Sequence, residues 1–174
     1  MFWLALLVAG VTLAWTTRAG TRWPGIYYMT GPSMEPAVRA GEYFLVWNPP
    51  GDLARGDLVV FRYEDEDGVF HVLRRLAGLP GDTIAMREGA IVVNGAPQPW
   101  RFQIIAPAAR RSPLARTEDL HTWGPWVVPP DSVVLLSDTR DMLGWPDSRF
   151  LGFIPRTDIV GKATRTVKGR ALRD

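Results

Sequence analysis

Short apolar runs separated by turn residues recur along most of the chain. From Tyr43 onward, Val, Ile, Leu and Phe cluster in stretches bounded by Gly, Pro, Asn or Asp, which is typical of β-strands. The dipeptide Asn94-Gly95 predicts a tight turn, and the acidic run at 64–67 predicts a solvated hairpin loop. The pattern predicts an all-β domain with strands at residues 43–47, 57–63, 69–76, 83–86, 90–93, 133–136 and 159–166.

Residues 1–17 contain no charged side chain. This length is at the lower limit for a helix that crosses a bilayer, and Trp3 and Trp15 stand near its ends, where indole rings favour the interface. A cleaved signal peptide would need a basic start and a small-x-small cleavage site, which are not evident; a buried core helix is the other alternative. We expect a transmembrane anchor, then a Gly/Pro-punctuated connector at 18–32 within a β-rich domain over 18–174.

Composition narrows the chemistry further. Residues 96–126 break the strand pattern with five prolines and predict an inserted loop or small subdomain. A net charge of +2 gives no reason to expect a nucleic-acid partner. The absence of Cys excludes disulfides, thiolate nucleophiles and cysteine-bound metal. The two histidines, His71 and His121, are far apart, so we expect neither a metal nor another cofactor.

The sharpest local motif is Gly-Pro-Ser-Met-Glu-Pro at residues 31–36. Two prolines restrict the backbone on both sides of Ser33. A stiff turn of this kind can hold a hydroxyl at the edge of a cleft and direct backbone N–H groups at an oxyanion. On local propensity alone, Ser33 could equally begin a turn or cap a helix.

Further motifs follow this serine in a fixed order. Together they resemble the sequence boxes of type I signal peptidases, the Ser–Lys endopeptidases that process exported proteins. The most specific pieces are Gly-Leu-Pro-Gly-Asp at 78–82 and the paired Asp-x-Arg-Asp and Asp-Ser-Arg-x-x-Gly segments. The matching segments lie at 31–36, 55–61, 74–82, 137–141 and 147–155.

The resemblance implies a mainly β fold of two antiparallel sheets behind an N-terminal transmembrane helix. It implies a monomeric single-pass protein of the bacterial inner membrane with its peptidase domain on the extracytoplasmic side. Signal-peptide-bearing preproteins would be cut by Ser33 after a small residue. Met34, Pro36 and the strand at 57–63 would lie near the substrate, although Met34 and the apolar residues of that strand could equally belong to the core. Arg18 and Arg22, which follow the anchor, would instead favour a cytoplasmic domain by the positive-inside rule.

The main departure from the family concerns the general base. Relatives place a lysine four residues ahead of the Gly-Leu-Pro-Gly-Asp turn, and this chain has Arg74 there. A guanidinium remains protonated far above neutral pH, so Arg74 is a poor base. His71 is the alternative base, but an odd offset of three residues along a strand points its ring to the opposite face from Arg74.

Two milder departures surround this position. Gly31 stands where some relatives carry a serine of the oxyanion hole, so the hole would rest on the Ser33 amide. The spacing from Asp141 to Asp147 is expanded, and Trp145 replaces a small hydroxyl residue that supports the lysine in relatives. Four charged residues would brace the cleft or form an ordinary surface ion-pair cluster: Asp138, Arg140, Asp147 and Arg149.

Three hypotheses for function remain at this stage. The first is an active signal peptidase with an unconventional base, either His71 or water organised by Arg74. The second is a catalytically silent homologue that binds exported peptides or pilin-like proteins. The third is a self-cleaving repressor-type Ser–Lys peptidase, which would need a DNA-binding module and a cleavable linker where the hydrophobic segment stands.

Overall fold

We describe the fold from a computed structural model, which covers residues 23–100, 122–139 and 146–172. The predicted anchor at 1–17 and most of the predicted insert at 96–126 lie outside the described residues. Within the described ranges, no helix combines the length and the apolar character needed to span a bilayer.

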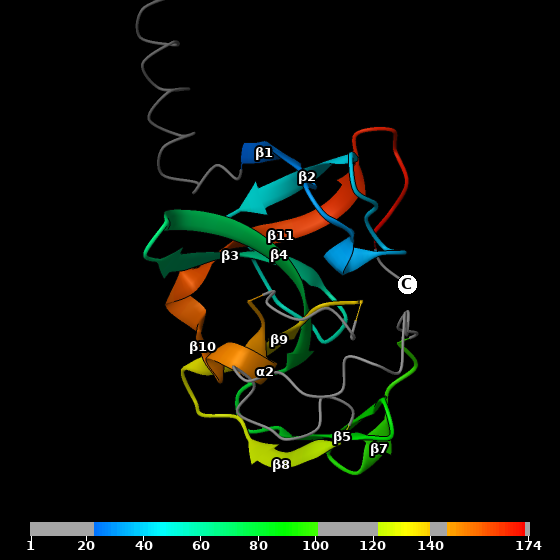
Figure 1. The fold of residues 1–174 in the computed structure, drawn as a ribbon, viewed down its shortest axis with the longest axis vertical. Coiled ribbons are helices and arrows are strands. Elements are labelled where there is room, and N and C mark those ends of the chain that lie inside the picture. Colours follow the sequence, from blue (N-terminus) through cyan, green and yellow to red (C-terminus); the bar gives the residue numbers. More distant parts are fainter. Residues whose placement is uncertain (1–22, 101–121, 140–145, 173–174) are drawn as a thin grey trace, which may run out of the picture.

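The described residues form two antiparallel sheets, which confirms the mainly β, two-sheet prediction (Figure 1). The larger sheet has the strand order β1-β2-β11-β3-β4-β9-β10, and the smaller sheet has the order β7-β6-β5-β8. The elements are β1 (Trp23–Tyr28), η1 (Pro32–Met34), β2 (Tyr43–Asn48), β3 (Leu58–Asp65), β4 (Gly68–Gly78), β5 (Thr83–Arg87), β6 (Ala90–Val93), β7 (Ala96–Pro97), β8 (Trp123–Val127), β9 (Ser132–Leu136), α2 (Ser148–Leu151), β10 (Ile154–Pro155), η2 (Arg156–Asp158) and β11 (Ile159–Thr166).

All seven predicted strands are present, and the acidic run at 64–67 forms the exposed β3–β4 hairpin, as predicted. The prediction was wrong for β1, which lies in the segment interpreted as a connector, and it did not foresee β8. Both strands contain proline, at Pro24 and Pro125, and both lie at the edge of their sheets. An edge strand tolerates proline because the missing N–H can face away from the neighbouring strand.

The β3–β4 hairpin explains why residues 58–61 read as a continuous apolar run. Paired residues of β3 and β4 share a face, so Val60 lies with Leu73 on one face and Phe61 with Val72 on the other. Val60 and Leu73 belong to a core cluster with Phe44 and Val46, whereas Phe61 and Val72 pack with Leu76, Val133 and Ile159. Both faces of the hairpin are therefore covered, and a buried strand needs no polar alternation.

Among the described strands, this topology leaves two strand edges without a neighbour. β1 is the first strand of the large sheet, and β4 pairs with β9 only from Arg75 onward. Residues 68–74 of β4 therefore have β3 on one side and no described strand on the other. The successive antiparallel pairings make β1 and β4 parallel to each other, so both run toward the same end of the sheet.

Candidate active site

Ser33 and Arg74 line one cavity of about 340 Å³, bordered by residues of β1 on one side and of β4 on the other. Most of its wall is aromatic or aliphatic, and the Pro146 segment, just ahead of α2, lies beside it. Cavities of this size with few convergent polar groups are typical of ligand sites. The apolar side chains of this wall include Tyr27, Phe44, Tyr63, Phe70 and Leu73.

The turn that carries Ser33 is held from two directions. Within the turn, the Glu35 N–H donates to the Pro32 carbonyl at 3.0 Å. From the loop after β9, the Thr139 N–H donates to the Ser33 carbonyl at 3.0 Å, and its hydroxyl donates to the Pro32 carbonyl at 2.8 Å. Gly31, at the start of η1, has no side chain to cap the first amides, including that of Ser33. The predicted oxyanion-hole role of the Ser33 amide stays a prediction.

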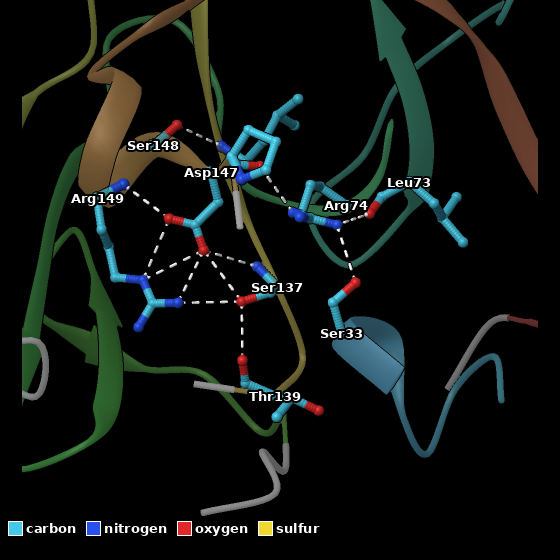
Figure 2. Close-up of polar contacts among 10 residues, drawn as sticks. Ser33, Leu73, Arg74, Ser137, Thr139, Asp147, Ser148 and Arg149 are labelled. Carbon is cyan, nitrogen blue, oxygen red and sulfur yellow. Dashed lines mark hydrogen bonds and ion pairs between the residues drawn. The ribbon is translucent and has the colours of Figure 1, made fainter. Parts of the chain in front are cut away.

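The guanidinium of Arg74 points directly at this serine (Figure 2). Its Nη1 donates to Ser33 Oγ at 3.2 Å and to the Leu73 carbonyl at 2.5 Å, and its Nε donates to the Pro146 carbonyl at 2.9 Å. The residue is only 1% exposed, and its Nη2 has no hydrogen-bond acceptor among the described residues. The hydroxyl oxygen of Ser33 therefore accepts a hydrogen bond from a buried arginine.

Burial also changes the acid–base behaviour of Arg74. Loss of solvation lowers its pKa to about 10, although the negative charge of Asp147 acts in the opposite direction. At pH 7 the protonated form then exceeds the neutral form by about a thousandfold. Arg74 is therefore a cation at neutral pH, with a neutral fraction that grows tenfold per pH unit.

Three of the four predicted charged residues belong to two buried ion pairs, one of which includes Arg75. Asp147 accepts from Arg149 Nη2 at 2.8 Å and from the Ser137 hydroxyl at 3.0 Å. Burial alone would raise the pKa of Asp147, but the charge and hydrogen bonds of Arg149 outweigh it and lower the pKa to about 2. Asp138 forms a bidentate pair with Arg75, with both N–O distances at 2.7 Å. Arg140, the fourth predicted member, lies outside the described residues, as does Trp145.

The other predicted site residues lie apart from this contact. The unbroken β3–β4 register places His71 on the face of Leu73, opposite to Arg74, as the odd spacing predicts. His71 lines the cavity, and its ring contacts Tyr27 at a centroid distance of 5.7 Å. Met34 is buried in a core cluster rather than in the cavity wall. Pro36 borders a second cavity, beside Arg75 and Trp100.

Sequence reasoning missed three contributors to the site. Thr139 lies inside a recognised box, at 137–141, but its role as a tether of η1 depends on a contact 107 residues away along the chain. Pro146 contributes a carbonyl, for which side-chain patterns give no signal. Tyr27 belongs to β1, whose Pro-Gly sequence resembles a loop.

Comparisons with known proteins identify the family. The profile of the family described as "Signal peptidase, peptidase S26" matches residues 1–167. The chain is 33% identical to signal peptidase I P of Bacillus subtilis subsp. natto over 164 residues, covering 91% of this chain and 84% of that protein. It is 29% identical to a signal peptidase I of Leptolyngbya laminosa, covering 78% of this chain and 64% of that protein.

A crystal structure of a signal peptidase I from Enterococcus faecalis V583 aligns with a TM-score of 0.44 and 20% identity, covering 66% of this chain and 99% of that one. Because these two values are low, the family assignment rests on the sequence matches. The sequence motifs that resemble type I signal peptidases, at residues 31–155, all lie within the region that the family profile matches. This chain belongs to the signal peptidase family, peptidase S26.

Proposed function

We propose that this chain is a membrane-bound serine endopeptidase that removes signal peptides from exported preproteins. Ser33 is the nucleophile, and cleavage follows a small residue. One observation carries the proposal: Ser33 Oγ lies 3.2 Å from the only described nitrogen donor that reaches it, Arg74 Nη1, in a cavity bordered by two free strand edges. Family membership supports the substrate class, because related proteins are named signal peptidase I.

Substrate binding follows from the edges of β1 and β4. An extended peptide can add to an exposed strand edge through main-chain hydrogen bonds, while alternate side chains enter pockets that give specificity. The cavity extends along β4 from Phe70 to Arg74 and faces residues 27–30. A peptide in this position would bring its scissile carbonyl to Ser33, and the crowded aromatic wall would favour small side chains beside the bond.

The chemistry needs a proton acceptor at Ser33, and the neutral fraction of Arg74 supplies it. As Ser33 Oγ bonds to the scissile carbonyl carbon, its proton passes to the neutral guanidine and the carbonyl becomes an oxyanion near the Ser33 amide. The resulting guanidinium returns that proton to the departing amine as the peptide bond breaks. Water then hydrolyses the acyl-enzyme. Reaching the neutral form costs about 4 kcal/mol at pH 7 for a pKa of about 10, so turnover is slow and favours alkaline pH.

The proposed setting is the bacterial inner membrane. A segment at 1–17 would anchor a monomer in the bilayer, and the peptidase domain would face the extracytoplasmic side, where signal peptides emerge. The apolar character of that segment and the family's exported substrates support this placement. Protease accessibility of a tag at the C-terminus in intact spheroplasts tests the orientation, since Arg18 and Arg22 favour the opposite one.

A second candidate is a homologue that binds signal peptides without cutting them. The direction of the hydrogen bond at Ser33 favours it, because the protonated guanidinium donates to the hydroxyl and takes no proton from it. In this case the cleft geometry and the peptide-binding edges remain useful, and only the chemical step is absent. The two candidates differ in a single measurable property, the Ser33-dependent cleavage of a preprotein.

The test compares the detergent-solubilised full chain with its Ser33→Ala variant on a preprotein between pH 7 and 9.5. Ser132→Ala is the matched control, because the Ser132 hydroxyl donates to Asp131 and Ser132 does not line the cavity. We expect cleavage by the wild type and the control, rising with pH, and none by Ser33→Ala. Uncut preprotein at every pH, with peptide binding retained, would establish the non-cleaving candidate instead.

A further inference from the structure

The second terminal nitrogen of Arg74 has no partner although it is buried. Nε and Nη1 have acceptors, whereas Nη2 has none among the described residues. Two nearby carboxylates, Asp147 and Asp138, act to raise the pKa of Arg74. Each of them is paired with another arginine, Asp147 with Arg149 and Asp138 with Arg75. Arg74 is thus a buried cation with an unsatisfied donor among the described residues, and it is one of the residues that line the cavity.

A buried charged donor without an acceptor is destabilising unless something else satisfies it. The partner that fits a guanidinium best is a planar anion with two oxygens, which for proteins means a carboxylate. Ser33 strengthens this fit: its oxygen accepts from Arg74, so its own hydroxyl proton remains available to a ligand. The two side chains together can hold both oxygens of one carboxylate.

The surroundings decide which carboxylate is bound. The wall is largely aromatic and aliphatic, and the free edges of β1 and β4 can pair with an extended main chain. A carboxylate at the end of such a chain would meet Arg74 where the scissile carbonyl of a longer peptide lies. We propose that Ser33 and Arg74 form a receptor for the C-terminal carboxylate of peptides, and that it retains the cleaved signal peptide.

This inference rests on the cleft of the proposed function, but it does not need the chain to cut peptides. Cleavage converts the neutral scissile amide, which would lie beside Arg74, into a carboxylate. The product therefore gains a charge-assisted hydrogen bond to Arg74 that the substrate lacks. The guanidinium stays charged throughout the neutral range, since its pKa is about 10. An active enzyme built this way is inhibited by its own signal peptide, and a silent one is a receptor for signal peptides already cut.

The test measures binding of a labelled peptide that ends at the cleavage site, as free acid and as C-terminal amide, to the full chain in detergent. Ser33→Ala is kept out of this comparison because it removes a ligand of the site. We expect the wild type to prefer the acid by tenfold or more, and Arg74→Gln to bind both forms within about twofold of each other. Arg156→Gln, at an exposed arginine in η2, is the control and should keep the wild-type preference.

Arg74→Lys adds a signature that altered folding would not produce. A buried amine titrates below neutral pH more readily than a guanidinium, so this variant should prefer the acid only at low pH. The wild type should keep its preference from pH 6 to 9. Retained affinity of Arg74→Gln for the amide peptide, with an unchanged melting temperature, shows that the variant is folded.

The outcomes separate this inference from the proposed function. Equal binding of acid and amide by the wild type, or no binding of either, overturns the receptor whatever the cleavage assay gives. A clear preference for the acid together with uncut preprotein supports the receptor and refutes the peptidase. A preference that survives in Arg74→Gln also overturns the inference, because the charge would then come from another residue.

Discussion

In the proposed mechanism, replacing Arg74 by lysine converts a slow peptidase into a fast one. With a pKa of about 10, about one Arg74 side chain in a hundred is neutral at pH 8. A lysine buried in the same position has its pKa lowered by about 3–5 units from roughly 10.4, so most molecules would carry a neutral amine at this pH. If the neutral base limits the rate, kcat/KM at pH 8 should rise about 100-fold.

Geometry allows this gain. Arg74 Nη1 lies 3.2 Å from Ser33 Oγ. A lysine amine falls short of that nitrogen by about 1.3 Å, one C–N bond, and can reach the serine through a changed rotamer or one water. The carbonyls of Leu73 and Pro146, which now accept from the guanidinium, would remain to orient the amine.

The assay is the initial rate of preprotein cleavage from pH 6.5 to 9.5 for the wild type and Arg74→Lys, each also in the Ser33→Ala background. The wild-type profile of log(kcat/KM) should rise by one unit per pH unit across this range, and the variant should level off at a lower pH. A flat wild-type profile, or a variant no faster than the wild type at pH 8, would refute neutral Arg74 as the base.

Two further substitutions test the structure around the site. Asp147→Asn leaves Arg149 buried without its anion and should lower the free energy of unfolding by about 3–5 kcal/mol. The pKa of Asp147 is lowered to about 2 from 3.8, so its stabilising contribution of about 2 kcal/mol is complete above pH 4 and is lost as pH falls toward 2; thermal melts between pH 2 and 6 should show that loss in the wild type and not in the variant. Thr139→Val removes the hydroxyl that donates to Pro32 and should lower stability by about 1 kcal/mol and kcat/KM by more than the exposed control Thr157→Val does. Equal kinetics for these two threonine variants would mean that the tether does not position Ser33.

Several features of this protein are properties of local sequence. The apolar run at 58–61 and the turn residues around Asn94-Gly95 predict strands and turns, because side-chain period and backbone freedom act over a few residues. The stiff turn at Ser33 follows from its flanking prolines in the same way. That Arg74 is a poor base also follows from its residue type, since a guanidinium holds its proton far more strongly than an amine.

The tertiary structure decided which contacts those residues make and how deeply they are buried. Pro24 in β1 is compatible with a strand only because that strand lies at a sheet edge, and edge position depends on distant pairing. Asp138 pairs with Arg75, and Thr139 tethers the serine turn, through contacts that span 63 and 107 residues of chain. The lowered pKa of Arg74 and the lack of an acceptor for its Nη2 among the described residues arise from burial. Desolvation and long-range register are set by the whole packed domain, so no local pattern of residues encodes them.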